Sequence, residues 1–308
     1  MTATTPERYD LIVIGAGSAA REAASRASTE HGASVAVIER ERWGGQCPNV
    51  ACKPTKQYVA AAELLRDLRV VAGELGIETS APTFDLARLK ARKDWLIGTQ
   101  ETWQARFADA GYETITAEAS FADAHTVRVG ERELASEHIL VATGSRTFVP
   151  PIPGLDEVPW VDHIGALELT ELPDSLLVLG GGAVGLELAQ AFSRFGSRVT
   201  IVQSGPRIAA RADLDASAEL TAALSEEGIE IATSARVTSV ASEGAGLIAT
   251  LTSGDGEERM VSAALLLVAS GRSPNVEELE LDAAGVAHDR HGIGVDERLR
   301  TNVPGIWA

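Results

Sequence analysis

The sequence has few cysteines and no long apolar run. Only Cys47 and Cys52 occur among its 308 residues, and no apolar segment reaches the length of a transmembrane helix. Residues 1–10 lack the basic region and cleavage site of a secretory signal peptide. We therefore expect a cytoplasmic protein that is not bound to a membrane. Because structural disulfides are rare in the cytosol, the cysteine pair indicates catalytic or metal-binding chemistry.

Basic residues are also scarce. The 27 Lys+Arg residues stand against 44 Asp+Glu residues, which gives a formal net charge of −17 at pH 7. This acidity disfavours nucleic acids and anionic membranes as partners. A hydrophobic content of 45% and a charged content of 23% are typical of a soluble globular protein, and the length allows two domains.

The chain contains two copies of one supersecondary pattern. Each copy has an apolar strand, a glycine-rich turn, a helix and a second apolar strand, as in the βαβ start of a Rossmann domain. The glycines allow a pyrophosphate to approach the backbone at the N-terminus of the helix. The alternative interpretation is two glycine-rich turns in an ordinary α/β protein. The turns are Gly15–Gly17 and Gly180–Gly185, the helices end near His31 and Phe195, and the second strands end at Glu39 and Gln203.

The two copies differ at the end of the second strand. Glu39 can accept hydrogen bonds from a ribose diol, as an adenine nucleotide with a free 2′-hydroxyl requires. Gln203 occupies the same place in the second copy without the charge, and Arg207 and Arg211 follow it. This second site would tolerate a 2′-phosphate, unless both arginines are simply solvated.

The cysteine segment, Gly44 to Lys56, requires a distorted backbone if its cysteines are to pair. Positions i and i+5 of a regular helix lie about 8.7 Å apart at Cα, whereas a disulfide needs less than about 7 Å. Pro48 and Asn49 suit such a distortion, and a strained, accessible disulfide exchanges readily. The alternatives are two buried thiols or half of a metal site. A metal site lacks partners, because the six histidines show no ligand spacing: His31, His125, His138, His163, His288 and His291.

The segment from Gly44 to Lys56 resembles the active-site segment of the class I pyridine nucleotide–disulfide oxidoreductases. These flavoproteins include dihydrolipoamide dehydrogenase, glutathione and mycothione reductases, and mercuric reductase. The resemblance extends over the whole chain. Its further motifs are Ala142–Arg146 with Pro151–Gly154, Gly185–Glu187, Ala269–Asn275 with Ser270 in place of the usual Thr, and Thr301–Ala308.

The resemblance implies an α/β fold of two Rossmann-like, three-layer domains, each with a small β-meander. An FAD-binding domain with the redox segment would span residues 1–150, an NAD(P)-binding domain 151–272, and a return to the first domain 273–308. Within the first domain we expect helix from Thr55 to about Ala72 and from Phe84 to about Gly111, with Trp95 and Trp103 in plain packing. Residues 118–142 alternate as a β-meander does.

The resemblance also implies a mechanism. NADPH or NADH would reduce FAD, which would open the Cys47–Cys52 disulfide. Cys52 would be the charge-transfer thiolate near the flavin, and Cys47 the thiol that meets the substrate. Lys56 would lie by the isoalloxazine, with Glu187 within about 4 Å of it. The implied cofactor-binding residues are Gly15, Gly17, Ser18, Ala19, Glu39, Gly45, Gln46, Lys56, Ala142, Thr143, Gly144, Gly180, Gly182, Val184, Gly185, Gln203, Arg207 and Gly271.

The family continues beyond the motif at Thr301–Ala308, with a dimerisation domain that supplies a His–Glu pair to the partner subunit. We therefore expect a truncated chain with substoichiometric FAD, little turnover and no family homodimer. The expected substrate is a small-molecule disulfide or Hg(II), as in mercuric reductase, with dihydrolipoamide dehydrogenase or a glutathione- or mycothione-type reductase as alternatives. A different class of function is an inactive nucleotide-binding remnant. Flavin content separates the two classes.

Overall fold

The computed structural model describes residues 5–78 and 80–308. It divides into two compact units. Unit 1 comprises residues 5–49, 98–146 and 272–308, and unit 2 comprises residues 50–78, 80–97 and 147–271. No helix among these residues has both the length and the apolar character that crossing a membrane requires.

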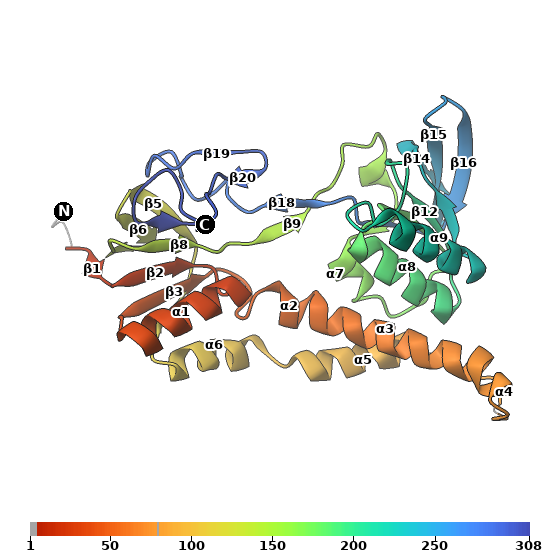
Figure 1. Ribbon diagram of the computed structural model, residues 1–308, viewed down its shortest axis with the longest axis horizontal. Coiled ribbons are helices and arrows are strands. Elements are labelled where there is room, and N and C mark those ends of the chain that lie inside the picture. Colours follow the sequence, from red (N-terminus) through yellow and green to blue (C-terminus); the bar gives the residue numbers. More distant parts are fainter. Residues whose placement is uncertain (1–4, 79) are drawn as a thin grey trace. The chain divides into compact units, whose positions relative to one another are not determined.

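Unit 1 is built on a five-stranded parallel sheet in the order β21-β8-β2-β3-β4. Residues of β2 alternate between its two faces. Ile12 and Ile14 join one buried cluster with Phe121 of the small sheet, and Val13 joins another with Phe107 of α6. Figure 1 shows α1 and α6 on one side of the sheet, and β5 and β6 on the other. The strands and helices of these layers are β2 (Leu11–Ile14), β3 (Val35–Glu39), β4 (Glu113–Thr116), β8 (Ile139–Val141), β21 (Ile306–Trp307), α1 (Ser18–His31) and α6 (Gln100–Asp109).

The third layer of unit 1 is a small sheet in the order β1-β7-β6-β5. The predicted meander is therefore present, although the last predicted residues, Ile139–Val141, form β8 of the main sheet instead. The remaining elements are β1 (Glu7–Arg8), β5 (Ala119–Asp123), β6 (Thr126–Val129), β7 (Arg132–Ala135), α2 (Gln46–Asn49) and the hairpin β19 (His288–Asp289) and β20 (Gly292–Ile293). Strands β9 (Ser145–Thr147) and β18 (Arg272–Pro274) pair where the chain passes between units.

Unit 2 repeats the plan with a parallel sheet in the order β10-β17-β11-β12-β13 and an antiparallel sheet β14-β15-β16. The predicted α/β fold of two parallel-sheet units, each with a small additional sheet, is confirmed. The elements are β10 (Trp160–Val161), β11 (Ser175–Leu179), β12 (Arg198–Val202), β13 (Glu230–Ala232), β14 (Ala235–Glu243), β15 (Gly246–Ser253), β16 (Glu258–Ala263), β17 (Leu265–Val268), α7 (His163–Ala166), α8 (Ala183–Phe195), α9 (Leu214–Glu226) and the 3-10 turn η2 (Leu155–Glu157).

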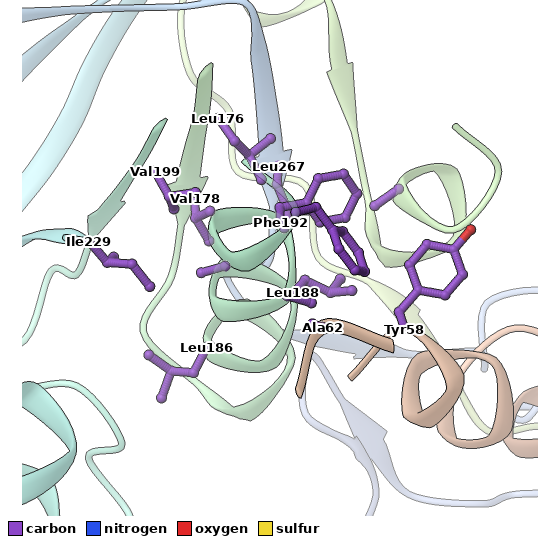
Figure 2. Close-up of a cluster of buried hydrophobic side chains, with 14 of the residues drawn as sticks. Tyr58, Ala62, Leu176, Val178, Leu186, Leu188, Phe192, Val199, Ile229 and Leu267 are labelled. Carbon is purple, nitrogen blue, oxygen red and sulfur yellow. The ribbon is translucent and has the colours of Figure 1, made fainter. Parts of the chain in front are cut away.

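The helices that follow the cysteines pack in unit 2 rather than with the first Rossmann sheet. Tyr58 and Ala62 lie in one buried cluster with Leu188 and Phe192 of α8 (Figure 2). Tyr58 also donates its hydroxyl proton to the carbonyl of Leu167 at 2.9 Å. By contacts, residues 50–97 thus group with 147–271, which differs from the predicted range of 1–150. The assignment of the ranges as cofactor-binding domains stays a prediction.

These helices are also more divided than the sequence pattern predicted. Helix α3 (Cys52–Arg66) begins three residues before the predicted start and continues as a π-helical turn η1 (Asp67–Val71) and a short α4 (Ala72–Glu74). The predicted second helix is two helices, α5 (Leu86–Ile97) and α6, because Gly98 adopts φ +73° and Thr99 caps α6 by accepting from Thr102 N.

The two tryptophans of this region differ in burial. Trp103 is buried, as predicted, but the prediction for Trp95 is wrong, because 70% of its surface is exposed. Trp95 instead lies beneath the Arg92 guanidinium, whose carbon is 4.6 Å from the ring centroid. A cation above an aromatic face is favourable at an exposed site.

Candidate functional site

The first glycine turn lies against the end of β8. Gly15 has φ +110°, and a Cβ there would be 2.3 Å from the carbonyl oxygen of Ala142. Only glycine fits this approach, which places Gly15 beside Ala142 and Thr143. Helix α1 begins at Ser18 after Gly17, and both Ser18 and Ala19 are exposed at its first turn. The turn therefore presents a helix N-terminus of the kind that binds phosphate groups.

Glu39 connects this turn to the loop that leads to the cysteines. Its Oε2 accepts from Ala16 N at 3.0 Å, and its Oε1 accepts from Glu41 N and Arg42 N at 2.9 and 3.0 Å. The carboxylate is thus fixed by three backbone donors at the end of β3. It retains acceptor capacity, because each carboxylate oxygen can accept two hydrogen bonds.

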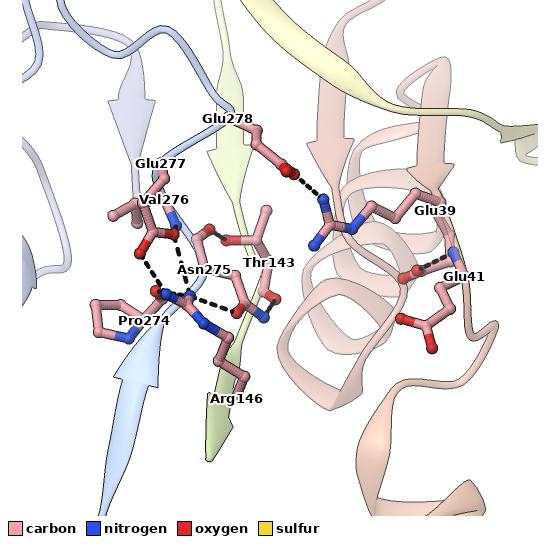
Figure 3. A network of polar contacts seen from close by, with 10 residues as sticks. Glu39, Glu41, Thr143, Arg146, Pro274, Asn275, Val276, Glu277 and Glu278 are labelled. Carbon is pink, nitrogen blue, oxygen red and sulfur yellow. Dashed lines mark hydrogen bonds and ion pairs between the residues drawn. The ribbon is translucent and has the colours of Figure 1, made fainter. Parts of the chain in front are cut away.

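A cavity of about 410 Å³ opens beside Gly15 and Glu39. Figure 3 shows the polar groups at this place, with Arg146 between Asn275 and Glu277. Arg146 pairs with Glu277 at 2.6 Å, and this guanidinium lowers the pKa of the Glu277 carboxyl to about 2. The side chain of Arg40 pairs with Glu278 at the same cavity. The sequence motifs do not predict these two ion pairs.

The walls of this cavity are held by bonds between distant segments. Thr143 Oγ1 donates to the carbonyl of Asn275 at 2.7 Å, and Asn275 Nδ2 donates to the carbonyl of Thr143 at 3.0 Å. The helix N-terminus at the glycine turn and the carboxylate of Glu39 are the kinds of group that bind the phosphates and the ribose diol of an adenine dinucleotide such as FAD. Gly144, the next residue after Thr143, also has a positive φ, of +69°, but unlike at Gly15 no atom lies within 4 Å of the place where its Cβ would be.

The cysteine segment is anchored by a buried amide. Asn49 Nδ2 donates to the carbonyls of Trp43 and Gly45 at 2.9 and 2.7 Å, and Asn49 Oδ1 accepts from Gln100 Nε2 at 3.1 Å. A Cβ on Gly45 would lie 2.5 Å from the Cα of Gly17. The loop before the cysteines therefore packs directly on the first glycine turn.

The backbone between the cysteines is not one regular helix. Helix α2 ends at Asn49, α3 begins at Cys52, and Ala51 between them has φ −129° and ψ −98°. The backbone between the cysteines therefore departs from a regular helix, as a Cys47–Cys52 bond would require. Both residues are thiols in the structure, with Cys47 half-buried and Cys52 exposed. The pairing itself stays a prediction.

Gln46, directly before Cys47, is bound to the strands at the passage between the units. Its Nε2 donates to the carbonyl of Ser145 at 2.5 Å, and its Oε1 accepts from the Arg272 guanidinium at 2.5 Å. Arg272 also donates to Ser145 Oγ at 2.8 Å. Gly271, with φ +141°, precedes this arginine. The motif Ala269–Asn275 includes Arg272 without predicting its role, and the structure shows that Arg272 contacts the redox segment through Gln46.

Lys56 and Glu187 meet as predicted. The ammonium nitrogen lies 2.5 Å from Glu187 Oε1, inside the predicted 4 Å. Both residues belong to unit 2, and their side chains are 61% and 39% exposed. Lys56 and Glu187 both lie near the N-termini of their helices, α3 and α8.

The second glycine turn repeats the first in unit 2. A Cβ on Gly180 would be 2.4 Å from the carbonyl oxygen of Ala269, and one on Gly185 would be 2.1 Å from the carbonyl oxygen of Gly180. Gly182 precedes α8, and Val184 is exposed in its first turn. This backbone can bind a second nucleotide phosphate in the same manner.

Gln203 takes the place of Glu39 in the second turn. Its Oε1 accepts from Gly181 N at 2.8 Å, as Glu39 accepts from Ala16 N. Arg207 does not point freely into solvent, because its guanidinium donates to the carbonyls of Ala210 and Ala212 at 2.7 Å each. Among the residues that the structure describes, no group of three or more His, Cys, Asp and Glu could hold a metal ion.

Comparisons with known proteins agree with this geometry. A family model described as pyridine nucleotide-disulphide oxidoreductase matches residues 9–308. The chain is 40% identical to a mercuric reductase of Streptomyces lividans over 97% of its own length and 64% of the relative's. It is 32% identical to a dihydrolipoyl dehydrogenase of Acholeplasma laidlawii over 98% of its length and 89% of the relative's.

A solved structure is similar as well. The HOCl-induced flavoprotein disulfide reductase RclA from Escherichia coli aligns with a TM-score of 0.83 and 31% identity, over 97% of this chain and 65% of that one. The chain thus spans about two thirds of the length of this reductase and of the Streptomyces relative.

Proposed function

Because this chain belongs to the pyridine nucleotide-disulphide oxidoreductase family, we propose that it is an FAD-dependent NAD(P)H disulfide oxidoreductase whose redox pair is Cys47 and Cys52. Its proposed substrate is Hg(II), since relatives that are 40% and 36% identical are mercuric reductases. A small-molecule disulfide is proposed beside it, because the family is one of disulphide oxidoreductases. Dihydrolipoamide is the second candidate, because a dihydrolipoyl dehydrogenase is 32% identical. A homodimer, as the family resemblance implies, belongs to the same proposal.

The observation that carries the proposal is the break in the helix between the two cysteines. A regular helix would keep their Cα atoms about 8.7 Å apart, too far for a disulfide. The break at Ala51 removes this restriction. Oxidation of the dithiol then releases two protons and two electrons and forms one S–S bond.

The chain's own residues suit the cofactors of such a reaction. The backbone at Gly15 and the carboxylate of Glu39 would hold FAD in the cavity of unit 1, and the turn at Gly180 would hold NAD(P)H. When bound, FAD supplies a carrier that accepts a hydride from NAD(P)H and passes an electron pair to the cysteines. Lys56 would place a positive charge beside the redox pair, and Glu187 would hold its ammonium in position.

The test is a count of thiols. The chain is first oxidised so that Cys47 and Cys52 form a disulfide, then loaded with FAD and freed of excess flavin. It is titrated anaerobically with NADPH or NADH, and new thiols are then counted. We expect flavin bleaching with two new thiols per chain, and none in Cys47→Ser or Cys52→Ser. Bleaching without new thiols would reject the cysteine pair as the acceptor. A chain that retains no flavin would support the nucleotide-binding remnant instead.

Glu187→Gln separates a functional role of the ion pair from a structural one. An exposed pair contributes only about 0.2–1 kcal/mol to the free energy of unfolding. We therefore expect flavin reduction by NAD(P)H to slow at least about tenfold while the melting temperature hardly changes. Glu219→Gln, an exposed change on α9, is the control. A melting temperature that falls without slower flavin reduction would mark the pair as structural.

A further inference from the structure

Four hydrogen bonds join Gln46, Ser145 and Arg272 into a closed group within unit 1. We call this group the Gln46 clamp. Gln46 Nε2 donates to the carbonyl of Ser145, and the Arg272 guanidinium donates to Gln46 Oε1, both at 2.5 Å. Arg272 also donates to the hydroxyl and to the carbonyl oxygen of Ser145. Each of the three residues is therefore bound to the other two.

The clamp joins three separate segments of the chain. Ser145 begins β9 and Arg272 begins β18, and these two strands pair. Gln46 begins α2, 226 positions before Arg272. Because a guanidinium is planar, the donors of Arg272 that reach Gln46 and Ser145 are held in a fixed geometry. Hydrogen bonds from a charged donor are also stronger than those between neutral groups. The clamp therefore holds the start of α2 on the two strands.

Cys47 follows Gln46 directly and belongs to the same four-residue turn, α2. At the other end of this turn, the buried Asn49 donates to the carbonyls of Trp43 and Gly45. Asn49 thus fixes the shape of the loop, whereas Gln46 fixes the loop to β9 and β18. The backbone of Cys47 is held from both ends of one turn.

We propose that Arg272 is a positioning residue for Cys47, and that it holds the turn of α2, through Gln46, in the place from which Cys47 bonds to Cys52. The inference rests on the proposed function, because it requires that the two cysteines form a disulfide. No step of the electron transfer proposed above uses Arg272. Bond formation within a chain is favoured when the reacting groups are held near the reactive geometry. Loss of the clamp should therefore shift the equilibrium from the disulfide toward the dithiol.

The test measures this equilibrium in glutathione buffers. The 308-residue chain is equilibrated anaerobically with mixtures of reduced and oxidised glutathione, quenched with acid and weighed by mass spectrometry. One cysteine attacks oxidised glutathione, and the other displaces the bound glutathione. One S–S bond breaks, one forms in the chain, which loses two hydrogens, and two molecules of reduced glutathione are released. The equilibrium constant compares two folded forms, so a change in global stability alone leaves it unaltered.

Arg272→Gln and Gln46→Ala should each lower the equilibrium constant by about fivefold, which corresponds to the net contribution of one hydrogen bond. The double variant should fall little further, because Arg272 acts through Gln46. Arg272→Lys keeps the charge and a donor and should lose less than Arg272→Gln. The matched control is Arg128→Gln, an exposed change on β6 that alters the net charge equally. Its constant should stay within about twofold of that of the unsubstituted chain.

The same spectra separate failure of the clamp from failure of the proposed function. An unsubstituted chain that keeps glutathione on each cysteine and never loses two hydrogens has no exchanging pair, which would reject the proposed function and the clamp with it. Disulfide formation with an unaltered or raised constant in Arg272→Gln would reject the clamp alone, even if the melting temperature fell. Fully additive losses in the double variant would reject the route through Gln46.

Discussion

Asn49→Asp is the sharpest test of how the redox segment is held. The substitution keeps the shape of the side chain but replaces the amide NH₂ with a carboxylate oxygen. That oxygen would face the carbonyls of Trp43 and Gly45, which now accept from Asn49 at 2.9 and 2.7 Å. Asn49 is only 4% exposed, so water replaces the lost donor poorly.

The expected cost is large at neutral pH. Each carbonyl that loses its donor costs about 1–3 kcal/mol, so the two together lower the free energy of unfolding by roughly 2–6 kcal/mol. Desolvation and the two carbonyls also disfavour the charged form, and they raise the pKa of this Asp above its unfolded value of about 3.9.

The sign of the pH dependence follows from the raised pKa. The native state binds a proton more tightly than the unfolded chain, so the variant is most stable at low pH and loses stability as pH rises through the folded pKa. A protonated carboxyl can donate to one of the two carbonyls. The stability gap to the unsubstituted chain should therefore shrink by about 1–3 kcal/mol between pH 8 and pH 5.5.

The assay is urea unfolding followed by tryptophan fluorescence, with Trp43 and Trp103 buried in the same unit. Gln104→Glu on α6 is the control, because it makes the same amide-to-acid change at a half-buried position. An Asn49→Asp chain as stable as the unsubstituted one at pH 8 would refute the reasoning. So would a stability gap that stays constant over the pH range.

Three further changes test single contacts. Gly45→Ala should destabilise by at least about 2 kcal/mol more than Gly76→Ala in thermal unfolding, because both have positive φ but only Gly45 lies against backbone; equal losses would exclude the close approach as the cause. Arg146→Gln should raise the pKa of Glu277 from about 2 toward 4.5, as measured by carboxyl NMR. The variant should also lack the stability that the ion pair contributes above pH 4.5, which the unsubstituted chain loses as the pH falls toward 2; an unchanged Glu277 titration would contradict the pairing. Lys93→Met should cost about 2 kcal/mol in urea unfolding, because the buried ammonium neutralises two carboxylates; an unchanged midpoint would show that the carboxylates do not need it.

The sequence was sufficient where the physical requirement is local. The turns at Gly15 and Gly180 could be predicted because only glycine combines a positive φ with a backbone neighbour closer than a Cβ allows. The way in which Ile12 and Ile14 face one cluster and Val13 faces another follows from the two-residue period of a strand. The need for a distorted backbone between the cysteines follows from helix geometry alone. The contact of Lys56 with Glu187, 131 residues apart, came only from the family resemblance.

The tertiary structure decided what depends on distant partners. Periodicity identifies an apolar face of α3, but it does not say that Tyr58 on this face packs on α8 in unit 2. The pairing of Arg40 with Glu278 joins residues 238 positions apart and leaves no local pattern. The role of Asn49 depends on carbonyls that only the folded loop brings together. A sequence pattern specifies the conformation of a segment, whereas the packing of whole elements selects its neighbours.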